Sequence, residues 1–286
     1  MQAKTQTFTL SDKPIQVWAF CCGSVRIKEK AFEVKRPGLL STLAAFPSKV
    51  FTDWMPIWCF AIDHPEGRFL IDTGDTDQVN DPAYYGQLKG LVHYYMTKQM
   101  GIKITREEEI DAQLKAIGWT CDSIDKVFMT HLHVDHIGGL NHFPNQEIFV
   151  HRIEHEKPHS VFPELLPNTF NPQLLDAQDQ EANWGKVARL TKDGSLLMVP
   201  TPGHTPGHCS FLLKTDEEHL LFAGDAVYYE GQLSKDRYSA TIHQLKSARS
   251  TIVKINAAAK AHPTIILPAH DPNAGIRLAD RTLTST

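Results

Sequence analysis

Three histidines and one aspartate lie within six positions of the chain, and two glycines follow them. The side chains are His131, His133, Asp135 and His136. Histidine is the commonest nitrogen ligand of zinc-like metals and aspartate supplies a hard oxygen, so this spacing indicates a metal site. Structural zinc sites are usually closed and often rich in cysteine, and this run contains none. The run therefore predicts an open metal site that can do chemistry.

Three further side chains of the same kind follow apolar runs later in the chain, each within two residues of a glycine or a proline: His204, Asp225 and His270. Alone, either of these histidines would be interpreted as a surface residue. Together with the first run they give five histidines and two aspartates, whereas one catalytic zinc takes about three protein ligands plus water. The set suits two metals that share a bridging carboxylate and a bridging hydroxide.

Apolar runs that end at these side chains predict the strands that position them. A hairpin is expected from residues 56–62 and 68–71, and a helix over 105–117 begins at a capping box, Thr105 to Glu108. An amphipathic helix is expected over 240–260, while 31–55 and 156–185 read as irregular. The other expected strands are 15–27 with a break at Gly23, 124–130, 146–151, 195–199, 209–214, 219–223 and 264–267. Two sheets covered by helices would accommodate this order.

The composition of the 286 residues is that of an ordinary globular protein, and it narrows the classes of partner. A net charge of −4 without a basic stripe excludes a nucleic-acid partner. The five cysteines are odd in number and lack C-x-x-C spacing, which favours buried, reduced thiols in a cytoplasmic protein. The polar first thirteen residues predict no secretory signal, and no apolar run predicts a membrane partner.

The pattern H-x-H-x-D-H, followed downstream by a histidine, an aspartate and a histidine, resembles the metallo-β-lactamase superfamily. The resemblance extends from Asp72 to His270, nearly the whole chain. It implies an α/β fold, an αββα sandwich of two mixed β-sheets flanked by helices, with a dinuclear site at one edge. A single metallo-hydrolase domain over 1–286 is expected, with an insertion at about 76–104.

The resemblance also assigns the side chains. It implies that His131, His133 and His204 bind a first metal, that Asp135, His136 and His270 bind a second, that Asp225 bridges them, and that Asp72 supports the site from behind. True β-lactamases usually carry cysteine at the position of Asp225, and flavo-diiron proteins carry glutamate at that of His133. These departures favour a symmetric site for two divalent ions. Its nitrogen and oxygen donors suit Zn²⁺ best and also accept iron, manganese or cobalt.

Tyr228, three residues after Asp225, narrows the resemblance to the N-acyl homoserine lactone lactonases, which carry D-x-x-Y at this point. The segment 56–74 is also similar to that group. The implied reaction is opening of the lactone ring by a metal-bridging hydroxide, with Tyr228 stabilising the oxyanion and Asp135 moving a proton to the leaving oxygen. The neighbouring Tyr229 leaves open which of the two tyrosines faces the substrate.

Other functions on the same fold remain as alternatives. A glyoxalase II-like thioesterase or a general esterase would share every metal ligand, but the first recognises glutathione with basic residues near the C-terminus, where this chain offers only Arg277 and Arg281. The acidic balance disfavours a nuclease. A non-enzyme that retains a metal or lactone is disfavoured by the open ligand set.

Several aromatic residues have two possible interpretations, and the remaining histidines are expected to have no direct part in the chemistry. The 76–104 stretch is aromatic and amphipathic, with a helix expected around 86–100. It is either core or a substrate-lining or dimer-forming insertion, so a homodimer is a further expectation. Another group is either core or the lining of an acyl-chain pocket: Phe51, Trp54, Trp58 and Tyr84. His208 is expected behind the ligands, and another group is expected in solvent: His151, His155 and His159.

Overall fold

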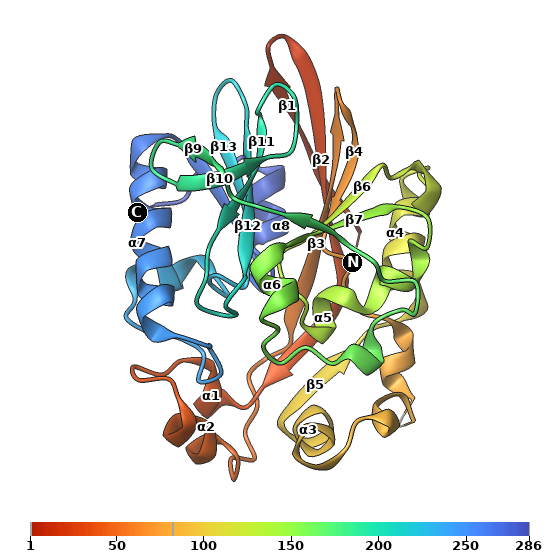
Figure 1. Ribbon diagram of the computed structural model, residues 1–286, viewed down its shortest axis with the longest axis vertical. Helices are drawn as coiled ribbons and strands as arrows, with labels where there is room; N and C mark the ends of the chain where they lie inside the picture. The colour runs from red at the N-terminus through yellow and green to blue at the C-terminus, as the bar shows by residue number, and fades with distance from the viewer. Residues whose placement is uncertain (1, 82, 286) are drawn as a thin grey trace.

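Two β-sheets face each other in the computed structural model, which describes residues 2–81 and 83–285 (Figure 1). The larger sheet has the order β1-β2-β3-β4-β6-β7-β8, with β5 paired to β2, and the smaller has the order β14-β13-β12-β11-β10-β9. The pairs β4–β6, β6–β7, β7–β8 and β13–β14 are parallel and the other pairs are antiparallel. Both sheets are therefore mixed.

The strands of the larger sheet are β1 (Lys4–Leu10), β2 (Lys13–Ile27), β3 (Met55–His64), β4 (Gly67–Ile71), β5 (Met100–Lys103), β6 (Lys126–Met129), β7 (Glu147–His151) and β8 (Gln173–Leu175). Those of the smaller sheet are β9 (Asp179–Glu181), β10 (Gly185–Arg189), β11 (Leu196–Pro200), β12 (Cys209–Lys214), β13 (His219–Gly224) and β14 (Thr264–Pro268).

The α-helices are α1 (Glu29–Phe32), α2 (Leu39–Ala45), α3 (Gly90–Tyr94), α4 (Ile110–Ala116), α5 (Val134–Ile137), α6 (Arg152–Glu156), α7 (Leu245–Ala261) and α8 (Ala274–Ala279). Short turns of other helix types are η1 (Asp77–Asn80), η2 (Tyr84–Gln87), the π-helical η3 (Tyr95–Gln99), η4 (Arg106–Glu108), η5 (Cys121–Ser123), η6 (Gly138–His142), η7 (Pro163–Leu165) and η8 (Glu230–Ser234).

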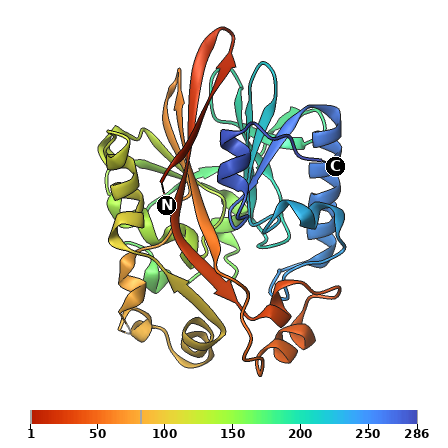
Figure 2. The same ribbon diagram turned by 180° about the vertical axis from the view of Figure 1, so that it is seen from behind.

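Strand β3 shows why its sequence is apolar throughout. Successive side chains of a strand point to opposite faces, and both faces of β3 are covered. Phe60 points into the core between the sheets, where its ring centroid lies 5.0 Å from that of Phe222, while Cys59 packs in the outer cluster with Leu114 of α4. Helix α7 packs on the outer face of the smaller sheet, as α4 packs on the outer face of the larger one (Figure 2). The four layers are those of the expected αββα sandwich.

The predicted hairpin and strands are present with small shifts at their ends, and the break in β2 falls at Gly23, where φ is +109°. The capping box at Thr105 also forms, but the helix is interrupted at Glu109, whose backbone is extended. Glu109 is held there by its side chain, which accepts hydrogen bonds from the Asp77 amide and the His142 ring. Tertiary partners therefore divide one predicted helix into two.

Four local predictions are wrong. The segment 156–185 was expected to be irregular, but it contains the strands β8 and β9, whose three residues each are too few to show an alternating pattern. The segment 31–55 contains the end of α1 and the short helix α2, which the glycines and prolines nearby concealed. The helix expected around 86–100 is split into α3 and the π-helical η3, and Met100 begins the edge strand β5. Strand β1 was not expected, because its alternation of Thr with Lys, Gln and Phe was interpreted as a polar terminus.

The 76–104 stretch comprises η1, η2, α3, η3 and β5, and its description as an insertion into one domain stays a prediction. Within the described residues, no helix combines the length and the apolar character that crossing a bilayer requires.

Candidate metal centre

The first histidine run lies where β6 ends and α5 begins. His133 is the N-cap of α5, so the first turn of that helix presents Asp135 and His136 on the same side. Gly138 and Gly139 let this turn pack against the loop after β4. A Cβ atom on Gly138 would lie 2.6 Å from the Asp75 Cα, and one on Gly139 would lie 2.4 Å from the Thr73 carbonyl oxygen. The two glycines are therefore required by close backbone contact.

The other three candidate ligands come from the smaller sheet. Strands β11, β13 and β14 run in the same direction, so their carboxyl ends meet at one edge. His204, Asp225 and His270 lie in the loops that follow those ends. The structure therefore brings all seven predicted ligands together, at the edge shared by both sheets.

The side chains form two groups with Asp225 between them. The ring nitrogens of His131, His133 and His204 all lie within 4.8 Å of one another, and so do the ligand atoms of Asp135, His136 and His270.

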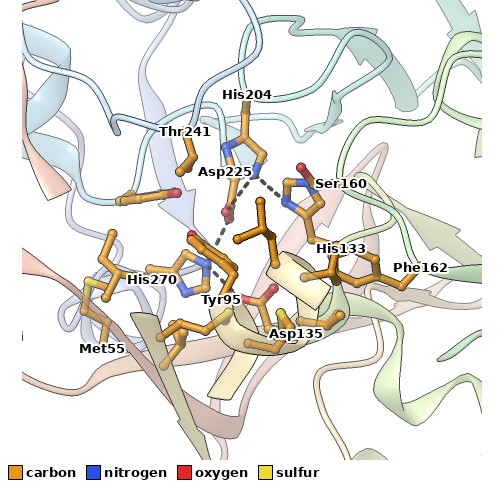
Figure 3. A pocket seen from close by; sticks show the side chains of 18 of the residues that line it. Met55, Tyr95, His133, Asp135, Ser160, Phe162, His204, Asp225, Thr241 and His270 are labelled. Carbon is orange, nitrogen blue, oxygen red and sulfur yellow. Dashed lines mark hydrogen bonds and ion pairs between the residues drawn. The ribbon is translucent and has the colours of Figure 1, made fainter. Parts of the chain in front are cut away.

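Asp225 faces both groups, one with each oxygen. Its Oδ2 lies 3.4 Å from His204 Nε2, while its Oδ1 lies 3.1 Å from His270 Nε2 and 3.4 Å from His136 Nε2. Figure 3 shows the carboxylate between His204 and His270. This is the position that a bridging carboxylate would need.

Four of the histidine rings are oriented by a hydrogen bond on the side away from the centre. The outward nitrogen of His131 donates to Thr130 Oγ1 (3.0 Å), and that of His136 donates to Asp72 Oδ2 (2.9 Å). The outward nitrogen of His270 donates to the Pro56 carbonyl (2.9 Å), and that of His133 donates to the His159 carbonyl (3.0 Å). Because the outward nitrogen carries the proton in each neutral ring, the inward nitrogen presents a lone pair.

Asp72 lies at the carboxyl end of β4 and joins two of these contacts. Besides His136, its carboxylate accepts hydrogen bonds of 2.8 Å from both the amide and the hydroxyl of Thr130. Thr130 in turn contacts His131. One buried carboxylate therefore orients a ring of each group, and Asp72 lies behind the site as the sequence predicted.

His208 also lies behind the predicted ligands. It is fully buried, its Nε2 accepts a hydrogen bond of 3.0 Å from the Asp225 amide, and burial lowers its pKa to about 3. The neutral ring therefore holds the backbone of the proposed bridging residue, which agrees with the expected supporting position.

The electrostatics of the centre favour a bound cation. Burial and the neighbouring histidines lower the pKa of His131 well below its usual value, so this ring is neutral. Burial also opposes protonation of His136, but Asp72, Asp135 and Asp225 raise its pKa well above the ordinary value. These carboxylates would equally stabilise a metal ion in place of that proton.

Several buried polar atoms at the centre have no hydrogen-bond partner among the described residues: His131 Nε2, His136 Nε2, His204 Nδ1 and Asp225 Oδ1. Unpartnered buried polar groups are costly, and three of these four atoms belong to the inward-facing donor set. Nitrogen and carboxylate donors of this kind fit divalent metal ions. The residues present therefore fit two metal ions, and their role as ligands stays a prediction.

A second acidic cluster, Glu109, Asp111 and His142, also has ligand atoms within 4.8 Å of one another. There the donors already have partners, because Arg106 pairs with Asp111 and His142 contacts Glu109 at 2.6 Å. Internal charge pairing explains this cluster without a metal.

The predicted ligands form the floor of a cavity of about 440 Å³ whose wall is mostly apolar. Five of the seven line the cavity directly, and His131 and His136 are fully buried without lining it. The wall is formed by Val25, Ile27, Phe46, Met55, Leu91, Val92, Tyr95, Met96, Met100, Val134 and Phe162. The polar residues beside them are His133, Asp135, Ser160, His204, Asp225, Tyr228, Thr241 and His270. No lysine or arginine is among these residues, so a neutral, largely apolar ligand fits best.

Tyr228, and not Tyr229, faces this cavity. The Tyr228 ring centroid lies 5.4 Å from that of His270 and 5.9 Å from that of His204. Tyr229 points elsewhere, and its hydroxyl contacts Glu33 and Lys235. Burial raises the pKa of Tyr228 well above its ordinary value, so its phenol remains a proton donor.

Tyr95 is a second phenol at the cavity that the sequence did not single out. It comes from η3, lines the cavity and points towards the centre in Figure 3. Burial, with a smaller contribution from Asp135, raises its pKa to about 12. Its place in an aromatic helical stretch was the only signal, and that signal does not distinguish a lining residue from a core residue.

The two-way interpretations are now resolved. Five residues of the 76–104 stretch line the cavity, while Tyr85 and Leu88 pack in the core, so both interpretations apply. The group Phe51, Trp54, Trp58 and Tyr84 lines no part of the cavity. The Trp58 indole, for example, lies in the core between the sheets and donates to the Asp271 carbonyl.

Two minor predictions need correction. His151 was expected in solvent, but it is buried, and its Nδ1 donates to the Gly207 carbonyl at 2.7 Å because the 207 loop packs directly on α6. His155 is exposed as expected. Four cysteines are buried, whereas Cys121 is partly exposed, and all five are free.

The fold and this arrangement of side chains agree with the comparison to known families. The family model of the metallo-beta-lactamase superfamily matches residues 52–270, and the chain belongs to that superfamily.

Several of its curated relatives are lactonases. An N-acyl homoserine lactonase, AttM, of Agrobacterium fabrum is 28% identical over 232 residues, covering 77% of this chain and 83% of that protein. An N-acyl homoserine lactonase, AiiA, of Bacillus thuringiensis is 28% identical over 233 residues, covering 80% and 85%.

Solved structures share the fold over almost the whole chain. A B. thuringiensis AiiA variant with N-decanoyl-L-homoserine at its active site has a TM-score of 0.72 at 22% identity, covering 96% of this chain and 95% of that chain. AidC, a dizinc quorum-quenching lactonase in complex with a product, has a TM-score of 0.62 at 18% identity, covering 96% and 92%.

Proposed function

We propose that the protein is a metal-dependent hydrolase that opens the lactone ring of N-acyl homoserine lactones, the signals removed in quorum quenching. The observation that carries the proposal is the position of Asp225. Its two oxygens face two separate ligand groups at the floor of an apolar cavity, next to the phenol of Tyr228. A lactone head is polar and its acyl tail is apolar, so the molecule matches the division between floor and wall. The names of the curated relatives support the same substrate class.

The seven predicted ligands would hold two divalent cations, for which zinc is the expected element. When bound, such ions supply Lewis acidity and lower the pKa of water towards neutrality. The chain's own part in this is the orientation of the donors, with Asp72 and Thr130 fixing a ring of each group.

Tyr228 and Asp135 have separate roles in the proposed reaction. The Tyr228 hydroxyl donates a hydrogen bond to the lactone carbonyl oxygen and stabilises its negative charge as water adds to the carbonyl carbon. Asp135, whose Oδ2 lies 3.4 Å from His270 Nε2, takes the proton that water loses as it adds and passes it to the ring oxygen as the ring C–O bond breaks. The oxygen of water enters the new carboxylate, and the ring oxygen becomes the hydroxyl of an N-acyl homoserine.

The main alternative is a glyoxalase II-like thioesterase, and the C-terminal arginines argue against it. Arg277 is buried, pairs with Glu230 and Asp271, and donates to the Ile266 carbonyl. Arg281 pairs with Glu217 and Glu218. Neither lines the cavity, so neither is free to recognise the carboxylates of a glutathione group.

The test measures acid release from N-acyl homoserine lactones of several chain lengths with metal-loaded protein. A thioester, a β-lactam and a phosphodiester serve as comparison substrates. We expect turnover of the lactones and little turnover of the other three. Fast thioester hydrolysis without lactone hydrolysis would overturn the proposal. A homodimer and a cytoplasmic location remain predictions of the sequence.

A further inference from the structure

The exposed large apolar side chains of the protein gather on two neighbouring segments. Ten such side chains are exposed among the described residues, and six of them lie in 35–50 and 86–99. We call these six the lobe face: Leu40, Leu43, Val50, Leu91, Val92 and Tyr94. Leu40 is 84% exposed and Leu91 is 79% exposed, which is unusual for leucine. Such a concentration marks a surface that contacts something apolar.

The two segments belong to one surface although they are far apart in sequence. The rings of Phe46 and Tyr94 stack with their centroids 6.1 Å apart, and the Gln99 amide donates to both the Phe46 carbonyl and the Tyr94 hydroxyl. Both segments lie at the same end of the molecule in Figures 1 and 2. Phe46, Leu91 and Val92 also line the cavity, so the cavity lies against this end.

The charge of these segments has one sign. Residues 35–50 and 86–99 contain Lys35, Arg36, Lys49, Lys89 and Lys98 but no aspartate or glutamate, in a chain whose net charge is −4. All five cations are exposed, and none forms an ion pair with a described residue. Nearby carboxylates lie outside the segments, and Glu33 among them already contacts Lys235.

From this juxtaposition we infer that the lobe face docks on the surface of an anionic lipid bilayer. Its apolar side chains enter the boundary between headgroups and acyl chains, and the five cations contact lipid phosphates. The cavity then lies next to the bilayer, where an amphiphilic ligand would partition. The inference concerns docking alone and goes beyond the proposed lactone hydrolysis.

A second copy of the chain fits this surface less well than a bilayer does. A two-fold dimer through the lobe face would place the five cations of each copy opposite the five of the other, without a carboxylate in either segment. Like charges that face each other across an interface cost several kcal/mol. Charge complementarity therefore selects an anionic surface. The sequence predicted no membrane partner because it offers no spanning run, and a surface made from two short segments leaves no such signal.

The experiment is flotation of the metal-loaded full chain with vesicles of phosphatidylcholine, with and without phosphatidylglycerol. We expect the protein to float with the anionic vesicles, to remain in solution with the neutral ones, and to dissociate at high salt. This readout needs no catalytic turnover, so its failure would leave the lactonase proposal standing, and the reverse also holds.

Two double variants test the two components of the surface. Leu40→Ser with Leu43→Ser removes apolar side chains that do not line the cavity, and we expect about a tenfold loss of vesicle affinity. Lys49→Glu with Lys89→Glu reverses two charges, and we expect a loss of more than about twentyfold.

Matched controls lie on α7, outside the two segments that form the lobe face. Val253→Ser removes a 69% exposed valine, and Lys246→Glu with Lys260→Glu reverses two exposed cations. These variants should bind vesicles as the parent does. Three results would overturn the inference: no binding to anionic vesicles, equal loss in the control and lobe variants, or a dimer in sedimentation that the Leu40 and Leu43 changes dissociate.

Discussion

The floor and the wall of the cavity are built from different kinds of backbone. The floor residues follow the ends of β6, β11, β13 and β14. Four of the five histidines among them are held by a hydrogen bond from the ring nitrogen that points away from the centre. Part of the wall comes from α3 and η3 and from Phe46 just after α2, which are short elements outside the two main sheets. Six of the seven floor side chains are buried and His133 is half-buried, whereas Leu91 in the wall is 79% exposed.

The floor and the wall are therefore expected to serve different functions. Catalytic geometry needs donors held within a fraction of an ångström, which strand ends packed against a core supply. Recognition of an acyl chain needs only apolar area of about the right shape, which tolerates looser elements. We therefore expect substitutions at the floor to remove metal and activity together, and substitutions in the wall to change substrate preference while metal is retained.

The largest expected effect is at Asp225. Replacing it by asparagine removes the negative charge that faces both groups of predicted ligands. We therefore expect reduced metal content and at least about a hundredfold loss of lactone turnover, the order of magnitude that loss of a key metal contact costs. Metal per chain by elemental analysis, together with ring opening, measures both. Retention of two metals per chain would refute the bridging assignment.

A second comparison separates the tyrosines. Tyr228→Phe should lower kcat by about a hundredfold, the usual cost of one oxyanion donor, with unchanged metal content. Tyr229→Phe is the matched control, because its hydroxyl contacts Glu33 and Lys235 instead of the cavity. Unchanged lactone kinetics in the Tyr228 variant would remove its assigned role and leave the metal ligands unaffected.

Tyr95→Phe belongs to the same series and asks whether the wall takes part in the chemistry. Both phenols line the cavity, but Tyr95 comes from a wall element. If floor and wall are separate in function, kcat for this variant should stay within about threefold of the parent value, well short of the loss that an oxyanion donor causes. A loss as large as that of Tyr228→Phe would contradict the division.

Asp72→Asn tests the support behind the floor. Its carboxylate orients His136 directly and His131 through Thr130, so we expect metal affinity to fall by about ten- to a hundredfold. Asp122→Asn changes an exposed carboxylate and should have no effect. Competition with a chromogenic chelator gives the affinities, and equal affinities in the two variants would show that the contact is dispensable.

A smaller loss than at Asp225 or Tyr228 is expected for a wall residue that lies away from the chemistry. Phe46→Ala removes an aromatic ring that lines the cavity, so the preference for long over short acyl chains, measured by kcat/KM, should fall by about tenfold. Metal content should not change. A loss of metal in this variant would show that wall and floor are one unit.

The sequence by itself determined the centre and the sheets that carry it. Ligand spacing such as H-x-H-x-D-H is local, and apolar runs before His204, Asp225 and His270 predict strands because strands in a covered sheet are buried on both faces. The hairpin of β3 and β4 could be predicted in this way, whereas the αββα fold and the placing of Asp72 behind the predicted ligands followed from the resemblance to the metallo-β-lactamase superfamily. The N-terminal strand and the short helices could not, because two turns of helix carry too little periodicity.

Only the tertiary structure decided which tyrosine faces the cavity and which residues form its wall. Tyr228 and Tyr229 are adjacent residues of the same type, so the sequence does not distinguish them. Tyr229 is turned away from the cavity because its hydroxyl contacts Glu33 and Lys235. The wall collects side chains from β2, β3, α3 and η3, and apolar residues look alike whether they line a cavity or fill a core. Candidate metal ligands can be recognised from their residue types and their spacing in the sequence, whereas a cavity depends on how distant segments pack.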